Sequence, residues 1–190
     1  EISKDSLAQT ATHIQSSILK YPIGIQDQYV AAFGGLNMYE TGYIDYDNVQ
    51  ITPLDIKNLE KKLVLFYTGV NRDTNEVLKK SSLEGLDGIQ QLAYQAKKIF
   101  EKGNLDDYGK LLNEHWEFKK KRYLGMTNDR IDEWYELGLK SGALGGKLVG
   151  AGGGGFLLFY TNNRDGLIEA MPLLHQPFKF DYEGSKVIYD

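Results

Sequence analysis

The feature that most constrains this chain is a glycine-rich stretch from Gly142 to Phe156. Eight of its fifteen residues are glycine, and four of them are consecutive, from Gly152 to Gly155. Glycine loses more backbone entropy on folding than any other residue, so this stretch is costly to order. The pattern favours a backbone that needs positive φ angles, or one that lies directly against a ligand or another main chain. A tight corner between two packed strands is the structural alternative.

Composition narrows the classes of protein to which the chain can belong. Its 190 residues are 42% hydrophobic and 25% charged, which is typical of a soluble globular protein with one large core or two small domains. The formal net charge of -4 argues against a nucleic-acid surface built on bulk positive charge. The absence of cysteine excludes disulfides and thiolate sites and is compatible with the cytoplasm. The longest apolar run, Phe156 to Tyr160, is too short to span a membrane.

Residues 1–56 are predicted to form a first segment with two helices and a short β-meander. Apolar side chains recur at helical spacing in residues 6–19, and a second helix begins near Asp27 and ends at Gly34-Gly35. Short strands are predicted at 36–40, 43–46 and 49–52, separated by turn residues. A shift in composition between Pro53 and Glu60 marks the domain boundary.

Residues 57–190 mix strands and helices without a regular βαβ alternation, which favours an α+β fold. An apolar run at 62–67 predicts a central strand. Helices are predicted at 73–80, 83–101, 105–122, from a cap at Thr127 or Asn128 onward, and near 165–174. Strands are predicted at 156–160, 178–182 and 186–189.

Asp27 is the first candidate for chemistry. A carboxylate beside a helix N-terminus can orient a substrate hydroxyl or accept its proton. An aspartate that only caps its helix has the same spacing, so this alternative stays open. The histidines His13, His115 and His175 are scattered, and no pair has the i, i+4 spacing of a metal site, so no metal ligand is assigned.

Basic residues give weaker candidates. Arg72 follows Thr68-Gly69, where a strand meets a helix, a position suited either to a phosphate contact or to a structural salt bridge. The run from Lys119 to Arg122 is typical of a solvated helix face. The glycine-rich stretch matches neither GxxxxGK[ST] nor a GxGxxG fingerprint, so a P-loop or Rossmann site is not supported.

Three segments, taken in this order, resemble the GHMP-type small-molecule kinases: Gly24 to Asn37, Leu65 to Gly69, and Gly142 to Phe156. The last of them is similar to the third motif of that superfamily. Gln26-Asp27-Gln28-Tyr29 points to the sugar kinases that phosphorylate D-glycero-D-manno-heptose 7-phosphate at its anomeric hydroxyl. The resemblance implies the end of an N-terminal, ribosomal S5-like kinase domain over residues 1–56. It implies a complete ferredoxin-like C-terminal α/β sandwich over residues 57–190.

The same resemblance implies phosphoryl transfer from ATP with Mg²⁺ to a sugar phosphate in the cytoplasm. Asp27 matches the acidic residue that such kinases place against the acceptor hydroxyl, as base or as orienting group. Gln26 and Arg72 are expected to contact the substrate. The residues expected near the nucleotide phosphates are Lys147, Gly150, Gly152, Gly153, Gly154 and Gly155.

Two departures from the family pattern bear on activity. The second superfamily motif, a Pro-x-x-x-Gly-Leu-Gly-Ser-Ser type loop, is absent from these residues, so the chain resembles only the C-terminal portion. We therefore expect a fragment that is inactive alone and that self-associates or pairs with a missing N-terminal half. The family commonly has a magnesium-binding Glu twelve residues before the catalytic Asp, and Gln15 stands there. The alternatives are an inactive GHMP-fold binding or scaffold protein, or a kinase for another sugar such as galactose or fucose.

Overall fold

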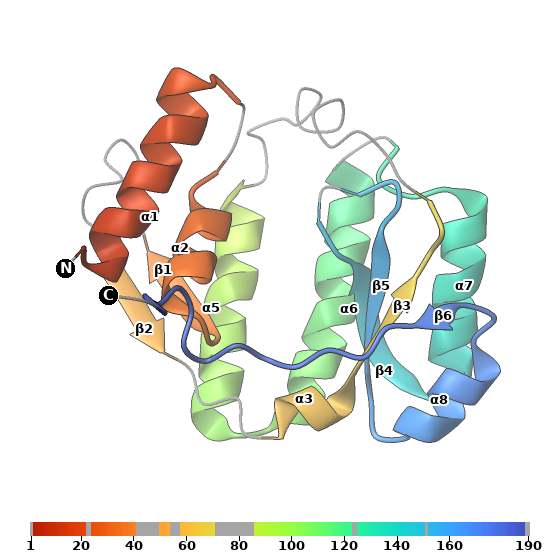
Figure 1. Ribbon diagram of the computed structural model, residues 1–190. Helices are drawn as coiled ribbons and strands as arrows, with labels where there is room; N and C mark the ends of the chain where they lie inside the picture. Colours follow the sequence, from red (N-terminus) through yellow and green to blue (C-terminus); the bar gives the residue numbers. More distant parts are fainter. Residues whose placement is uncertain are drawn as a thin grey trace. The chain divides into compact units, whose positions relative to one another are not determined.

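The computed structural model describes residues 2–21, 24–40, 50–53, 58–70, 86–122, 125–150 and 152–188. The chain splits into two compact units, and each is described by itself (Figure 1). The first unit consists of Glu1–Asp55 and Lys179–Asp190, and the second of Ile56–Phe178. The sequence assigned residues 179–190 to the second domain, whereas in the structure they group with the first unit. Among the described residues, no helix is both long enough and apolar enough to cross a membrane.

The described part of the first unit contains two α-helices, one π-helical segment and two strands. They are α1 (Lys4–His13), η1 (Ile14–Ile18), α2 (Gln26–Phe33), β1 (Asn37–Glu40) and β2 (Gln50–Pro53). The predicted helix at 6–19 is confirmed as continuous helix, although its second half has π-type hydrogen bonds. β1 and β2 pair antiparallel, which confirms the predicted strands at 36–40 and 49–52 within a few residues. The strand predicted at 43–46 lies outside the described residues.

The core of the first unit is small and fixes one face of α2. Ala8 of α1 packs against Tyr29 and Ala32 of α2, and all three side chains are buried. The Tyr29 ring also packs on Tyr39, with ring centroids 5.9 Å apart, and on Phe33 of its own helix. Because buried positions of a helix recur every three to four residues, this packing leaves the intervening residues of α2 at the surface.

Within its described residues, the second unit is built around a four-stranded antiparallel sheet with the order β4-β5-β3-β6. Its elements are α3 (Leu59–Lys62), β3 (Leu63–Tyr67), α5 (Leu86–Lys102), α6 (Leu105–Arg122), α7 (Asp129–Lys140), β4 (Ala143–Leu148), β5 (Phe156–Thr161), α8 (Arg164–Ala170) and β6 (Leu174–His175). The predicted central strand at 62–67 is confirmed, since β3 lies inside the sheet. The mixture of helices with an antiparallel sheet confirms the α+β class.

Two helical glycines let α6 and α7 approach the sheet closely. A Cβ on Gly109 of α6 would lie 2.6 Å from the Tyr160 ring, and one on Gly138 of α7 would lie 2.5 Å from the Phe159 ring. Tyr160 and Phe159 are neighbours on β5, so their side chains point to opposite faces of the sheet. The two helices therefore pack on different faces of β5. Buried aromatic residues fill the Phe159 side, where the Tyr135 ring stacks at 5.5 Å.

Several predicted elements differ from the structure. The strand β4 lies inside the glycine-rich stretch, where no strand was predicted. The strands predicted at 178–182 and 186–189 are wrong for the described residues 176–188, which form irregular chain. The helix predicted near 165–174 ends at Ala170. The helix predicted at 73–80 lies outside the described residues.

Candidate active site

Asp27 lies in the first turn of α2 and lines a cavity of about 470 Å³ in the first unit. The N-cap position belongs to Ile25, so Asp27 does not cap its helix. A carboxylate in the first turn is favoured by the partial positive charge of a helix N-terminus. Asp27 is exposed because the neighbouring residues of α2, Gln28 and Tyr29, take the buried face. The packing of α2 therefore presents this carboxylate to the cavity.

Polar side chains from three segments share this cavity with Asp27. Gln15 comes from η1, Gln28 from α2, and Ser185 from the C-terminal segment. The amide groups of Gln15 and Gln28 contact each other directly. With its nitrogen turned toward the main chain, Gln28 donates to the carbonyl of Gly24 at 3.1 Å and to that of Ile25 at 2.9 Å. Gln28 therefore supports the turn that leads into α2.

The C-terminal segment packs against the C-terminal end of α2. Both the amide and the hydroxyl of Ser185 donate to the Ala31 carbonyl at 3.0 Å, and the Gly35 amide donates to the Asp181 carbonyl at 2.5 Å. The Asp181 carboxylate accepts from the amides of the two residues before Ser185, at 2.9 and 3.1 Å. These amides hold the pKa of Asp181 below its usual value. The strand pattern of residues 178–189 concealed this contact, whereas the Asp-x-x-Gly turn spacing is a signal that could have revealed it.

The glycine-rich loop of the second unit connects β4 to β5. Positive φ angles occur at Gly150 (80°), Gly152 (103°), Gly153 (76°) and Gly155 (93°), as the sequence predicted. The loop is held from two sides by main-chain hydrogen bonds. The Gly153 amide donates to the Met126 carbonyl at 2.8 Å, and the Gly155 amide donates to the Val70 carbonyl at the same distance. These two amides are therefore engaged by the protein's own backbone.

Close contacts explain why glycine is required within this hairpin. A Cβ on Gly152 would lie 2.0 Å from the Met126 sulfur, and one on Gly154 would lie 2.4 Å from the Val70 carbonyl oxygen. The expectation that the stretch lies against another main chain is confirmed at Gly154. The alternative prediction, a tight corner between two packed strands, is also partly correct, since the loop joins two paired strands.

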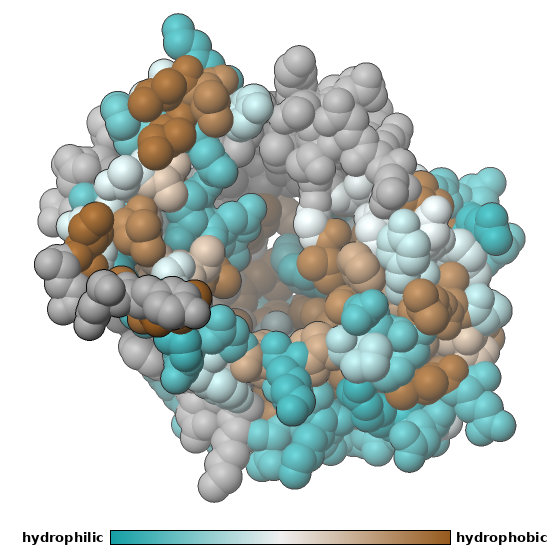
Figure 2. Space-filling view, viewed as in Figure 1, coloured by the Kyte–Doolittle hydropathy of each residue, from teal (hydrophilic) through white to brown (hydrophobic). Residues whose placement is uncertain are grey.

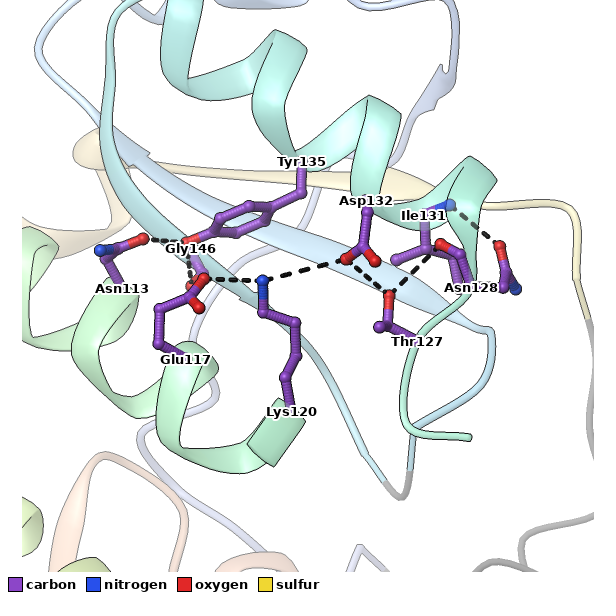
Figure 3. A network of polar contacts seen from close by, with 9 residues as sticks. All are labelled: Asn113, Glu117, Lys120, Thr127, Asn128, Ile131, Asp132, Tyr135 and Gly146. Carbon is purple, nitrogen blue, oxygen red and sulfur yellow. Dashed lines mark hydrogen bonds and ion pairs between the residues drawn. The ribbon is translucent and has the colours of Figure 1, made fainter. Parts of the chain in front are cut away.

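A polar network holds α6 and α7 together beside β4 (Figure 3). The Tyr135 hydroxyl lies 2.7 Å from the Asn113 side-chain oxygen and 3.0 Å from the Gly146 carbonyl oxygen, and burial raises the pKa of Tyr135. Lys120 forms an ion pair with Glu117 at 2.7 Å and lies 4.0 Å from Asp132. The side chain of Asn128 accepts from the Ile131 amide at 3.0 Å, which confirms the predicted cap of α7. This network fixes β4 and the turn that supports the glycine loop.

Three basic side chains gather at the start of the glycine loop. Lys119 donates to the Gly150 carbonyl at 2.6 Å. Burial lowers the pKa of Lys147, and burial together with the charge of Lys147 lowers the pKa of Lys119 to about 8. Burial and the two lysine charges lower the pKa of His115 to about 4. The sequence assigned no metal-ligand role to His115, and it placed Lys119 in a run typical of a solvated helix face.

The predicted site residues that the structure describes belong to two different units. Gln26 and Asp27 are consecutive exposed residues at the start of α2 in the first unit. Lys147 lies on β4, and the predicted loop glycines follow it in the second unit. Arg72 lies outside the described residues.

The second unit also matches a known family. Residues 96–173 match the family model described as GHMP kinases C terminal. This part of the second unit is therefore similar to the C-terminal domain of the GHMP kinases. The predicted resemblance to the GHMP kinases is thereby confirmed, and the matched residues of the GHMP domain run from α5 to the turn after α8.

The relatives that this chain matches include heptose phosphate kinases. The chain is 31% identical to D-glycero-alpha-D-manno-heptose 7-phosphate kinase of Campylobacter jejuni, with 95% of the chain and 58% of that relative covered. The crystal structure of a D-glycero-D-manno-heptose 1-phosphate kinase from Bacteroides thetaiotaomicron is similar with a TM-score of 0.68 and 26% identity, covering 99% of this chain and 57% of the other. The fold also resembles Lactococcus lactis galactokinase, with a TM-score of 0.67, 19% identity, and coverage of 97% and 61%. The chain thus spans little more than half the length of these relatives.

Proposed function

We propose that this chain is the C-terminal part of an ATP-dependent sugar kinase that phosphorylates the anomeric hydroxyl of a heptose 7-phosphate. The similarity to heptose phosphate kinases supports the substrate class. The observation that carries the proposal is the place of Asp27 on the wall of a cavity of about 470 Å³, large enough to admit a sugar. The chemistry needs alignment and charge neutralisation more than covalent help from the protein.

In the proposed reaction, Asp27 contacts the acceptor hydroxyl. The hydroxyl oxygen attacks the γ-phosphorus of ATP, the bond between that phosphorus and the β–γ bridging oxygen breaks, and ADP leaves. The carboxylate of Asp27 orients the hydroxyl and accepts its proton. We assign Gln26 and Arg72 to substrate binding. The residues that we assign to the phosphates are Lys147, Gly150, Gly152, Gly153, Gly154 and Gly155.

The described residues do not by themselves fit the magnesium ion that such a kinase uses. Among them, no group of three or more His, Cys, Asp or Glu side chains is placed to hold a metal. Gln15 shares the cavity with Asp27, but its amide is in contact with Gln28. A neutral amide is a poor substitute for a carboxylate as a ligand of this hard cation. No step of the proposed reaction is therefore assigned to a metal bound by these residues.

Replacement of Asp27 by Asn tests the proposal. The chain, joined to the N-terminal part of the Campylobacter relative, would be assayed with ATP and heptose 7-phosphate, and we expect Asp27→Asn to lower kcat by about 10²- to 10⁴-fold. Asp129→Asn is a matched control, because Asp129 is an exposed aspartate in the first turn of α7. An active enzyme that tolerates Asp27→Asn would refute the role of Asp27. Calorimetric titration of the unjoined chain with heptose 7-phosphate gives a second readout if the joined protein does not fold.

The contact between Gln15 and Gln28 favours one second candidate, a GHMP-fold binding or scaffold protein without catalysis. An amide pair in place of a carboxylate weakens any cation site in this cavity without removing the room for a sugar phosphate. The two candidates differ in magnesium-dependent ATP binding by the joined protein, measured by calorimetry. Tight binding that requires magnesium would count against the scaffold. A panel with galactose and fucose as acceptors would separate other sugars of the same superfamily.

A further inference from the structure

The second unit contains a cavity of about 160 Å³ with one basic end. Its wall is mainly apolar and comes from α5 and α6, and Lys147 and His115 are the basic residues that line it. Lys119 lies one helical turn after His115 on the same face of α6. Lys119 reaches the Gly150 carbonyl, so the basic end of the cavity adjoins the first residue of the glycine loop.

The strand geometry directs Lys147 toward α6. A Cβ on Gly145 would lie 2.0 Å from the Gly109 carbonyl oxygen, so this position of β4 faces α6 directly. Residues two apart on a strand share a face, and Lys147 follows Gly145 by two. The missing side chain at Gly145 lets α6 lie close to β4. As a result, the Lys147 side chain is partly buried between the strand and the helix.

Within the described part of the chain, no carboxylate forms an ion pair with any of the three basic side chains. Glu117 lies between His115 and Lys119 in the sequence of α6, but it forms its ion pair with Lys120. A partly buried ammonium group without a counter-charge is costly. The lowered pKa values of all three groups agree with this arrangement, because burial disfavours each charged form. Repulsion by Lys147 lowers the pKa values of Lys119 and His115 further.

We infer that His115, Lys119 and Lys147 form a binding site for the phosphate group of a phosphate ester. The two ammonium groups supply the counter-charge, and the apolar wall of the cavity receives part of the organic group. This inference rests on the proposed function only in using Lys147 as a phosphate ligand. It assigns His115 and Lys119 a role that is independent of Asp27.

The test uses the imidazole NMR signals of the whole chain during a titration with inorganic phosphate. The chain has three histidines, so His13 and His175 serve as internal references. We expect a saturable shift of the His115 signal with phosphate and no saturable shift with sodium chloride at matched ionic strength. Lys147→Met and Lys119→Met should each weaken phosphate binding at least ten-fold. Lys110→Met, which removes an exposed lysine of α6 that pairs with Asp107, should leave binding unchanged.

Further arms identify the ligand and separate this site from the proposed reaction. Adenosine monophosphate and heptose 7-phosphate distinguish a nucleotide from a sugar phosphate, and either one binding at least as tightly as inorganic phosphate supports the site. Lys147→Arg keeps the charge and should keep the affinity within about three-fold. Equal shifts with phosphate and chloride, or full affinity in Lys147→Met, would overturn the inference. Asp27→Asn should not change the titration with inorganic phosphate. If the phosphate site is refuted, the proposed role of Asp27 is therefore unaffected.

Discussion

Two glycines of the β4–β5 loop are required for different physical reasons. Gly150 has a φ of 80°, and a Cβ there would meet no atom within 4 Å. Gly154 has no positive φ, but a Cβ there would lie 2.4 Å from a main-chain oxygen of Val70. Gly150 is needed for its left-handed backbone conformation, and Gly154 is needed because no side chain fits beside Val70. Sequence alone does not distinguish these two members of one glycine-rich stretch.

We expect Gly154→Ala to destabilise the second unit by about 1–3 kcal/mol through overpacking against fixed backbone. Gly150→Ala should cost only about 1 kcal/mol for the left-handed conformation. Both tryptophans, Trp116 and Trp134, are buried in the second unit, so their fluorescence during urea unfolding reports on that unit. If Gly150→Ala proved the more damaging change, the contact with Val70 would not be the reason for glycine at position 154.

His115 should make the second unit sensitive to acid. Its pKa is about 4 in the folded chain and 6.5 in the reference state, so the unfolded chain binds more protons between these values. The free energy of unfolding is therefore highest above pH 6.5, and it falls by about 1–3 kcal/mol as the pH falls toward 4. His115→Gln should flatten the pH dependence of the unfolding free energy in this window. His13→Gln, an exposed residue of α1, is the control, and an equal slope in both variants would contradict the assignment.

At the scale of elements, long periodic segments were predictable and glycine-rich or turn-linked ones were not. The helix at 105–122 and the strand at 62–67 follow directly from apolar spacing. β4 was missed because Gly145 and Gly146 have low strand propensity, whereas tertiary contacts with α6 and Phe159 select it. Residues 178–189 have strand-like alternation, but the main chain of Asp181 and Ser185 forms hydrogen bonds with the end of α2.

The candidate site was predictable to a similar degree. Asp27 was placed correctly at a helix N-terminus, because the helix boundary can be read from the flanking turn residues. Ser185 could not be associated with Asp27, since 158 residues separate them and only the folded chain brings both to one cavity. The same holds for Lys147 and His115, which meet through the packing of α6 on β4.

The contact between the C-terminal segment and the end of α2 should be sensitive to a single added methyl group. Gly184 has a φ of 64°, and a Cβ there would lie 2.4 Å from the Ala32 carbonyl oxygen. We expect Gly184→Ala to lower hydrogen-exchange protection of the Gly35 and Ser185 amides at least ten-fold, because both bond across this contact. Gly103→Ala is the matched control.

Gly103 has a φ of 73° and no atom within 4 Å of a Cβ, so its replacement carries the conformational cost without the contact. Unchanged protection of Gly35 and Ser185 in Gly184→Ala would show that this contact tolerates the extra methyl group.

At the scale of the whole molecule, the first unit exposes a large apolar surface. Figure 2 shows hydrophobic side chains gathered at the end of the α1–η1 helix, where Ile18 is 62% and Leu19 is 51% exposed. Patches of this kind mark interaction surfaces or sites of aggregation. The chain spans 58% of its Campylobacter relative, and we propose that sequence matching the remainder covers this surface.

We expect the chain without such a partner to associate with itself in light-scattering measurements. Ile18→Lys with Leu19→Lys should shift it toward monomer. Val187→Lys with Ile188→Lys changes another apolar pair, which is more exposed than Ile18 and Leu19, and should have little effect. A clean monomer across the micromolar range for the unaltered chain would contradict the prediction.

The grouping of residues 179–190 with the first unit sets an order of events during synthesis. The second unit is one continuous stretch, Ile56–Phe178, and all of its contacts are available once residue 178 has left the ribosome. The first unit instead joins residues more than 120 positions apart, as in the bond from Ser185 to Ala31. Contacts of such long sequence separation form slowly. We therefore expect the contacts between the C-terminal segment and the end of α2 to form after the glycine loop has folded.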